Sequence, residues 1–302
     1  MKAVQINNYG DSSVIEINEN AEVPAPKENQ VLVEVHAVSV NPFDLKLIGG
    51  AMKDRMQLTF PYTIGGDFAG ITTETKEEVF GQAQGLAGNS GSFAEFVAVN
   101  TESIGPKPKN INFEEAAALP LVGSSAVQAL EDHLQLEKGQ KILIHGGAGG
   151  IGHLAIQIAK AIGAYVITTV STKDVEFVKN LGADEVIDYT KQKFEDLVSN
   201  IDAVYDTVGG ETQDKSLKIL KKGGKIVSMI GQPNPSLAAD LGVISIGQGT
   251  KTNTDHLTRL AKYVEGGKVK VNIEKVFQLE EAKEAFEKQA QHPQGKIVLK
   301  II

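Results

Sequence analysis

The sequence contains no cysteine and no tryptophan. Without cysteine, the chain forms no disulfide and offers neither a thiolate metal ligand nor a thiolate nucleophile. Long apolar runs are absent too, since no segment approaches the about 20 apolar residues that span a bilayer. The first ten residues lack the apolar core of a signal peptide. We therefore expect a cytoplasmic protein without a membrane segment.

The charge balance is acidic. Lysine and arginine together number 30 against 38 aspartates and glutamates, which gives a formal net charge of −8. Binding to nucleic acid or to an anionic membrane surface needs clustered basic residues. We therefore expect neither as a partner, and we place the chain among cytosolic enzymes and small-molecule binding proteins.

The chain is long enough for two domains. Its 302 residues exceed the roughly 250 to 300 at which a single core stops growing. Residues 1 to about 100 carry short segments of period-two alternation, for example Val31, Val33 and Val35, broken by Gly, Pro and Asn. This pattern predicts a mostly antiparallel, barrel-like β domain.

The pattern changes after Asn112. Residues 113–134 are alanine-rich with a helical period, which Pro120 interrupts. From Lys141 to Gly231, apolar segments typical of strands alternate with segments typical of helices. This alternation predicts βαβ units and a doubly wound parallel sheet. A helix, a strand, a second helix and a last strand are expected after Thr254.

A glycine-rich motif lies between a predicted strand and a predicted helix. In KILIHGGAGGIGHLAIQIAK, Gly147, Gly149 and Gly152 stand in GxGxxG register. The first glycine permits a tight turn, the second lets a pyrophosphate approach the backbone, and the third lets helix and strand pack closely. The start of the helix supplies N–H groups to the phosphates. The motif in this context predicts dinucleotide binding.

The end of the next predicted strand indicates which dinucleotide is bound. An NAD site usually has an acidic residue there for the ribose hydroxyls. Here the residues are Val170, Ser171, Thr172 and Lys173, without a carboxylate among them. Hydroxyl and ammonium donors suit a 2′-phosphate, so we expect NADPH as the cofactor. Ser171 and Thr172 could equally cap the following helix, and the two roles are compatible.

Eight motifs spread over most of the chain resemble those of one family. In chain order they are NPFDLK (Asn41 to Lys46), GGDFAG (Gly65 to Gly70), GSFAEFVAV (Gly91 to Val99), AALPLVGSSA (Ala117 to Ala126), HGGAGGIG, DTVGG (Asp206 to Gly210), GGKIVSMIG (Gly223 to Gly231) and GKIVL. The set resembles the zinc-independent quinone oxidoreductases of the medium-chain dehydrogenase/reductase superfamily.

This resemblance implies an α/β fold with a GroES-like, β-rich catalytic domain and a Rossmann doubly wound, parallel-sheet cofactor domain. The catalytic domain is expected at 1–115, with 250–302 returning to it, and the NADP-binding domain at 116–249. The active site of the family lies in the cleft between the two domains.

The resemblance also implies roles for individual residues. Asn41 and Asp44 are expected to face the nicotinamide and the acceptor, with Tyr62 as a hydrogen-bond donor nearby. Asn-Pro also starts turns, so Asn41 and Asp44 could simply form one. The expected cofactor contacts are Ser125, Met229, Ile230 and Gly231 near the nicotinamide, Gly147, Gly149, Gly150, Ile151 and Gly152 at the pyrophosphate, and Ser171, Lys173 and Tyr189 at the adenosine ribose phosphate. Tyr189 could equally be an ordinary tyrosine at the end of a strand.

Zinc dehydrogenases of the same superfamily place metal ligands where this chain has Asn41, Gly66 and a position near Leu121. None of these residues binds zinc as cysteine or histidine does, so we expect no metal. Without a Lewis acid, the hydride acceptor should delocalise the developing charge itself. We therefore expect NADPH-dependent reduction of quinones or α,β-unsaturated carbonyl compounds.

Two other functions stay open at this point. The scaffold could serve a 2-alkenal or enoyl-thioester reductase, or the chain could be a low-turnover NADPH-binding regulatory protein. The family also commonly forms homodimers through the cofactor domain. The apolar segment LGVISIGQ, Leu241 to Gln248, is the candidate surface, because an edge strand can extend one sheet into another. An internal strand explains this segment equally well.

Overall fold

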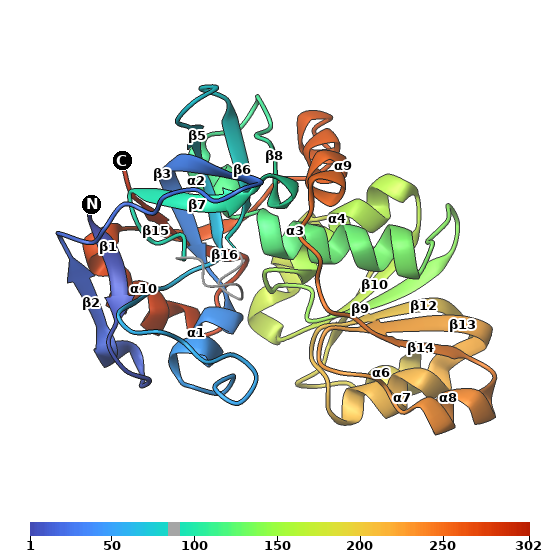
Figure 1. Ribbon diagram of the computed structural model, residues 1–302. Helices are drawn as coiled ribbons and strands as arrows, with labels where there is room; N and C mark the ends of the chain where they lie inside the picture. Colours follow the sequence, from blue (N-terminus) through green and yellow to red (C-terminus); the bar gives the residue numbers. More distant parts are fainter. Residues whose placement is uncertain (84–90) are drawn as a thin grey trace. The chain divides into compact units, whose positions relative to one another are not determined.

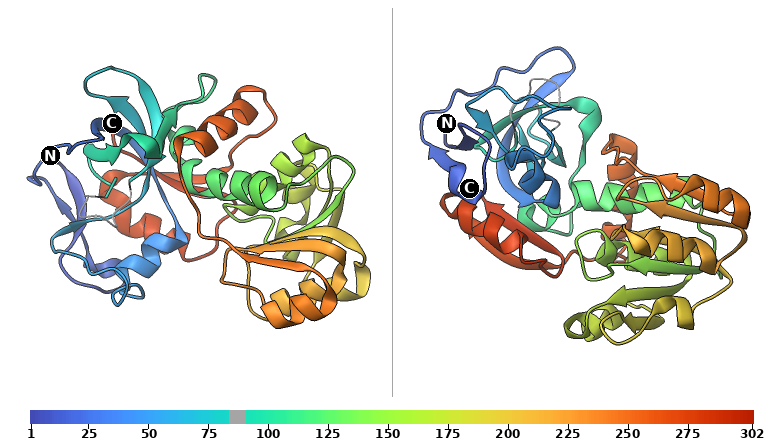
Figure 2. Two further views of the ribbon diagram at one scale, coloured as in Figure 1. Left: turned by 45° about the vertical axis from the view of Figure 1, so that its right-hand side comes forward. Right: turned by 90° about the horizontal axis from the view of Figure 1, so that it is seen from below.

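The computed structural model describes residues 1–83 and 91–302, which form two compact units (Figure 1). Unit 1 comprises Met1–Ser124, Thr252–Glu265 and Val271–Ile302, and unit 2 comprises Ser125–Lys251 and Gly266–Lys270. Both ends of the chain belong to unit 1, as Figure 2 shows. The C-terminal segment therefore completes the unit that the N-terminal segment begins.

Unit 1 contains two β-sheets. A three-stranded antiparallel sheet has the order β2-β1-β4, and a seven-stranded sheet has the order β15-β16-β3-β5-β6-β8, with β7 paired to β3. The strands are β1 Ala3–Ile6, β2 Ile15–Asn18, β3 Gln30–Val40, β4 Tyr62–Thr63, β5 Asp67–Thr72, β6 Glu78–Gln82, β7 Phe96–Asn100, β8 Ile104–Pro106, β15 Ile273–Gln278 and β16 Lys296–Lys300. Strand β3 shows the predicted alternation at Val33 and Val35, which are fully buried, whereas Val31 near its start is only partly buried.

The pairing of three strands determines where the chemistry of unit 1 lies. Strand β3 pairs antiparallel with β16, with Ile297 opposite Val40, and antiparallel with β5, with Asp67 opposite Ser39. Helix α1 (Pro42–Ile48) begins directly after β3, and Pro42 suits the first helical position because it has no N–H to satisfy. The other helices are α2 Phe113–Ala117, α9 Thr254–Glu265 and α10 Ala282–Gln289.

Unit 2 has a six-stranded parallel sheet of order β11-β10-β9-β12-β13-β14. Its strands are β9 Lys141–His145, β10 Tyr165–Val170, β11 Glu185–Asp188, β12 Ile201–Asp206, β13 Leu220–Ser228 and β14 Ile244–Gly247. Its helices are α4 Gly152–Ile162, α5 Val175–Asn180, α6 Phe194–Leu197, α7 Glu211–Ile219 and α8 Pro235–Leu241. Figure 1 shows α4 on one face of this sheet and α6, α7 and α8 on the other.

The strand order confirms the doubly wound fold. The first strand of this unit, β9, lies inside the sheet. The next two strands, β10 and β11, lie on one side of it, and β12, β13 and β14 lie on the other. Ligands of such sheets bind outside the carboxyl ends of the strands, where the order reverses. The loop after β9, which contains the glycine motif, lies at this switch point.

Two predicted segments differ in detail from the structure. The helical segment 113–134 divides into α2, α3 (Pro120–Val127) and a π-helical turn, Gln128–His133, and Pro120, the expected interruption, is the first residue of α3. The apolar segment from Leu241 to Gln248 is only partly a strand, because α8 extends to Leu241 and β14 covers four residues. In the described ranges, no helix is long and apolar enough to cross a membrane.

Candidate functional site

The glycine motif forms a close-packed turn between β9 and α4. A Cβ atom on Gly147 would lie 2.1 Å from Oγ1 of Thr168, and one on Gly152 would lie 2.2 Å from the carbonyl oxygen of Gly146. By contrast, a Cβ on Gly149 would meet only the Gly146 oxygen, at 3.5 Å. Gly147 and Gly152 are therefore required by internal packing, whereas Gly149 borders open space where a ligand can approach the backbone.

Helix α4 directs its N-terminus into this turn. Among the described residues, the N–H groups of Gly150 and Ile151 have no backbone acceptor, and both residues are partly exposed. The His153 N–H and ring Nδ1 lie 3.1 Å and 3.0 Å from the carbonyl oxygen of Gly149, which fixes the first turn of the helix. Free N–H groups at the positive end of a helix dipole suit a pyrophosphate.

The structure places Ser171, Lys173 and Tyr189 just beyond the carboxyl ends of two neighbouring strands. Ser171 follows β10 and Tyr189 follows β11, and these neighbouring parallel strands end in register, with Val170 opposite Asp188. Lys173 is exposed, and Tyr189 is 63% exposed. The ammonium and the ring are thus accessible to an adenosine phosphate, as the predicted role requires.

Two carboxylates lie among these donors. The Ser171 hydroxyl donates to Asp174 at 2.6 Å, and the Thr172 hydroxyl donates to Asp188 at 2.5 Å. Asp188 also accepts from the hydroxyl of Thr190 at 2.7 Å. The hydrogen bonds from the two threonines hold the pKa of Asp188 well below its usual range. The segment Val170–Lys173 has no acid of its own, but the fold places two beside it.

The residues expected near the nicotinamide lie directly after β13 or at the start of unit 2. The N–H of Ile230 donates to the Ser228 hydroxyl at 3.1 Å, and Ile230 is 48% exposed. The N–H of Met229 donates to the carbonyl oxygen of Asp206 at 2.9 Å, and Gly231 has φ of +93°. The buried Ser125 hydroxyl lies 2.6 Å from that of Thr250. The turn after β13 therefore leaves the apolar side chain of Ile230 exposed at the carboxyl ends of the strands.

In unit 1, four side chains form a buried polar cluster, Asn41, Asp44, Asp67 and Lys296, none more than 3% exposed. The Asn41 amide donates to Asp67 at 2.9 Å, and its Oδ1 accepts from the Lys296 ammonium at 2.5 Å. The Asn41 N–H donates to Asp44 at 2.7 Å. Asn41 is the N-cap of helix α1, where the Asp44 carboxylate accepts from the Asn41 N–H and the Asp44 N–H donates to the Asn41 carbonyl oxygen at 2.9 Å. The side-chain amide of Asn41 binds Asp67 and Lys296.

Burial determines the charges of the cluster. Desolvation raises the pKa of Asp44 to about 7, with hydrogen bonding to Asn41 opposing it. Desolvation also raises the pKa of Asp67 and lowers that of Lys296, and each is opposed by the charge of the other. Burial, with a smaller effect of Asp44, raises the pKa of Tyr62 to about 12, so this hydroxyl stays a donor.

Asp67 and Lys296 are functional candidates that the sequence reasoning missed. Both stand in motifs that carried the resemblance, GGDFAG and GKIVL, but neither was assigned a role. A signal was present, because Lys296 opens an apolar strand and a charged residue in a buried strand needs a partner. Its hydrogen-bond partner Asn41 lies 255 positions earlier in the chain, so only the pairing of β16 with β3 reveals the contact.

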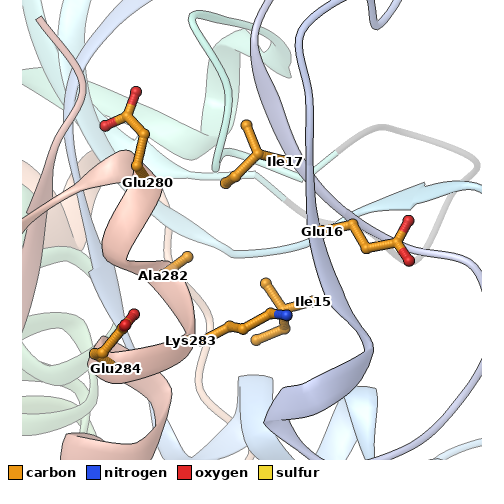
Figure 3. Close-up of a pocket in the computed structure, with 7 residues that line it drawn as sticks. All are labelled: Ile15, Glu16, Ile17, Glu280, Ala282, Lys283 and Glu284. Atoms are coloured by element: carbon orange, nitrogen blue, oxygen red, sulfur yellow. The ribbon is translucent and has the colours of Figure 1, made fainter.

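A surface pocket of about 500 Å³ lies between β2 and α10 in unit 1 (Figure 3). Figure 3 shows Lys283 extending toward Ile15 and Glu16 pointing away from the helix. Its lining contains three glutamates, one lysine and three apolar residues, and none of the predicted site residues: Ile15, Glu16, Ile17, Glu280, Ala282, Lys283 and Glu284. An acidic rim does not suit an anionic cofactor.

Among residues 1–83 and 91–302, no three histidine, cysteine, aspartate or glutamate side chains gather into a group that could hold a metal ion. The side chain of Asn41 binds Lys296 and Asp67.

Two protein families match the sequence. The family described as alcohol dehydrogenase GroES-like domain matches residues 27–109, and the family described as zinc-binding dehydrogenase matches residues 181–299. The first match falls in unit 1, and the second runs from unit 2 into the C-terminal part of unit 1.

Relatives with known names cover nearly the whole chain. A 2-methylene-furan-3-one reductase of Solanum lycopersicum is 38% identical over 91% of this chain and 71% of the relative. A chloroplastic NADPH-dependent alkenal/one oxidoreductase of Arabidopsis thaliana is 36% identical over 99% of this chain and 79% of the relative. The solved quinone oxidoreductase of Coxiella burnetii is 34% identical, with a TM-score of 0.91 over 100% of this chain and 99% of the other.

The β-rich unit and the parallel-sheet unit with its glycine turn define a two-domain, dinucleotide-dependent oxidoreductase. The similarities are close enough to place the chain within one family of this class. It belongs to the medium-chain dehydrogenase/reductase superfamily, among the quinone and alkenal oxidoreductases.

Proposed function

We propose that this chain reduces α,β-unsaturated carbonyl compounds or quinones with NADPH as the hydride donor. The observation that carries the proposal is its 36% identity, over nearly the full length, to an oxidoreductase named for NADPH and for alkenals and alkenones. The tomato relative is named for a conjugated ketone as well.

The residues of unit 2 fit NADPH. The open space at Gly149 and the free N–H groups of Gly150 and Ile151 suit its pyrophosphate, and the exposed Lys173 suits its 2′-phosphate. Ser171 reaches the phosphate by exchanging its hydrogen bond with Asp174. When bound, NADPH supplies a hydride to the acceptor. Ile230, exposed after β13, provides an apolar surface for the nicotinamide.

The residues of unit 1 suit a conjugated acceptor. Hydride adds to the β-carbon of an enone, the electrons of the carbon–carbon double bond move toward the carbonyl oxygen, and a proton adds at the α-carbon. The developing negative oxygen requires hydrogen-bond donors. We assign the Asn41 amide and the Tyr62 hydroxyl to this task. Asp44, whose pKa burial raises to about 7, holds a proton in part of the molecules at neutral pH.

The relatives favour an enzyme over a low-turnover regulatory protein, because each is named as a reductase or oxidoreductase. They also favour free alkenals, alkenones and quinones over an enoyl thioester. An assay of NADPH oxidation with a quinone, an enal, an enone and an enoyl thioester tests both points. Turnover of none of these four would refute the proposed function.

The role of Asn41 is tested by Asn41→Ala. We expect kcat for an enone to fall by roughly tenfold or more, with a smaller loss for a quinone, which stabilises its own charge. NADPH affinity should be unchanged because unit 2 holds the cofactor. Since Asp67 and Lys296 lose a partner, the variant should also be less stable, so kinetics are measured well below its Tm. Equal losses for both substrates in folded protein would show that Asn41 is only structural.

We also propose a cytoplasmic homodimer. Strand β14 is at the edge of the sheet of unit 2, and its Ile244 is 48% exposed, so a second copy can pair with this edge. Light scattering at micromolar concentration should report a dimer, and Ile244→Lys should shift it toward monomer. A monomer for the unchanged chain refutes the dimer, and cell fractionation tests the location, since one relative is chloroplastic.

A further inference from the structure

Lys296 and Asp67 flank the end of strand β3, where Asn41 begins the turn into α1. Lys296 is the first residue of β16 and Asp67 the first of β5, and these strands pair with β3 on its two sides near Val40. Lys296 is 2% exposed and Asp67 is fully buried. Burying two charges is unfavourable unless each is well partnered, so their contacts show what the pair does.

The ammonium of Lys296 makes two hydrogen bonds and one longer ion pair. It donates to the carbonyl oxygen of Val40 at 3.1 Å and to Oδ1 of Asn41 at 2.5 Å, and it lies 3.8 Å from Oδ2 of Asp67. Asp67 in turn accepts from the Leu121 N–H at 3.0 Å and from the Ser39 hydroxyl at 3.2 Å. Both charged groups are thus fixed by backbone and side-chain contacts.

These two charges determine the orientation of the Asn41 amide. Its oxygen faces the Lys296 ammonium, and its nitrogen faces the Asp67 carboxylate at 2.9 Å. The flipped amide would place N–H against ammonium and oxygen against carboxylate, which is repulsive on both sides. One hydrogen of the amide nitrogen therefore binds Asp67. The second hydrogen has no acceptor among the described residues.

We propose that Lys296 and Asp67 are positioning residues that lock the Asn41 amide with its second N–H available to the carbonyl oxygen of the acceptor. The proposal rests on the proposed function and adds two residues to it. A donor that is already oriented needs no reorganisation as negative charge develops on that oxygen, which is why fixed donors are effective in catalysis. An amide free to flip would present its own oxygen in part of the molecules.

The alternative is that Lys296 is only a structural lysine, and the chain offers a matched control. Lys107, also in unit 1, is 8% exposed, and its ammonium donates to the carbonyl oxygens of Pro108 and Ile111 and pairs with Glu78 at 3.0 Å. It makes no contact with Asn41. Lys107→Met therefore reports what the loss of a buried lysine does to unit 1 without changing the amide.

The experiment compares the wild type, Lys107→Met, Lys296→Met and the double variant Lys296→Met/Asp67→Asn, with methyl vinyl ketone as enone and menadione as quinone. The chain has no cysteine for either compound to alkylate. Lys296→Met leaves the Asp67 carboxylate without its counter-charge and should lower Tm strongly, whereas the double variant removes both charges and should recover most of it. The amide that Asp67→Asn introduces can donate or accept, so the amide of Asn41 loses its fixed orientation.

We expect kcat for methyl vinyl ketone to fall about tenfold or more in the double variant, with kcat for menadione and the Kd of NADPH changed by less than about threefold. Lys107→Met should lower Tm and leave the ratio of the two kcat values unchanged. A double variant with recovered Tm and the wild-type ratio overturns the proposal. If the wild-type protein turns over neither compound, the proposed function is refuted rather than the positioning role.

A second measurement needs no lysine variant. In the 15N-labelled wild type with bound NADP⁺, the two side-chain amide protons of Asn41, assigned by their loss in Asn41→Asp, should respond differently to saturation with a non-reacting saturated ketone. One proton, bonded to Asp67, should be protected from exchange and nearly unshifted, and the other should shift. If neither or both shift equally, the amide is not locked as proposed.

Discussion

The polar groups of the two units are prepared for their ligands in opposite ways. In unit 1, Asn41, Asp67 and Lys296 are buried and bonded to one another. In unit 2, the groups expected to hold the cofactor are backbone N–H groups and accessible side chains such as Lys173 and Tyr189. The first arrangement is complete on folding and fixes charge in a dry environment. The second leaves its donors free for a charged ligand.

The largest effect should come from the glycine turn of unit 2. Gly152→Ala places a methyl group 2.2 Å from the Gly146 oxygen and 2.7 Å from the Gly147 Cα, so the turn must shift. We expect a lower Tm and a loss of NADPH affinity of roughly a hundredfold or more, measured by fluorescence titration. Gly149→Ala is the matched control, since its methyl group meets only one atom, at 3.5 Å. It should weaken NADPH binding without lowering Tm, and a drop in Tm of the size seen for Gly152→Ala would contradict this division of roles.

The pH dependence of the free energy of unfolding should also differ between a carboxyl group of unit 1 and one of unit 2. The pKa of Asp44 rises from 3.8 to about 7 on folding, so the folded state binds more protons between these values. Its stabilising contribution is full below the unfolded pKa and is lost as the pH rises through about 7. Asp44→Asn keeps the acceptor for the Asn41 N–H and should raise the free energy of unfolding at pH 8 by up to about 4 kcal/mol, with little change at pH 4.

The pKa of Asp188 in unit 2 shifts in the opposite direction on folding, so its effect on stability has the opposite pH dependence. Its folded pKa is lowered, so its contribution is present above the unfolded pKa and is lost as the pH falls through the folded value. Asp188→Asn should therefore be destabilising at neutral pH and neutral in strong acid. Urea unfolding at several pH values measures both variants. Parallel pH profiles for the two would contradict the assigned shifts.

A smaller effect is expected at Lys173. One charge-assisted contact with the 2′-phosphate contributes roughly 1.5 to 3 kcal/mol, so Lys173→Ala should weaken NADPH by about tenfold or more. NADH, which lacks this phosphate, should bind as before. Lys191 lies near the same strand ends, with its ammonium 3.1 Å from Asp188. Lys191→Ala is therefore the control for the loss of one positive charge there. Titrations that give the wild type equal affinity for NADPH and NADH would end the assignment.

No effect at all is expected from removal of metal. The chain has no cysteine, and the family resemblance implies that Asn41 and Gly66 stand where the zinc enzymes have metal ligands. Extensive chelation should leave the kcat and the Tm of the protein unchanged. Elemental analysis that finds stoichiometric zinc, lost together with activity, would be decisive against this expectation.

Much of unit 2 could be predicted from the sequence because its signals are local. Each strand, turn and helix from Lys141 to Gly231 is a contiguous apolar or glycine pattern, and the parallel sheet follows from their alternation. The turn at Gly147 to Gly152 depends on a steric requirement for glycine that any chain with this geometry shares. The sequence alone therefore determined the class of fold and the kind of ligand.

The chemistry of unit 1 was decided by tertiary structure. Asn41, Asp67 and Lys296 are far apart in the chain, and only the pairing of β3 with β5 and β16 brings them together. The same is true of Asp188, which joins Thr172 only because β10 and β11 are neighbours. Hydrogen bonds and charge pairs between distant segments leave no periodic pattern in a sequence, and burial, which sets the charges of Asp44 and Lys296, is a property of the packed core.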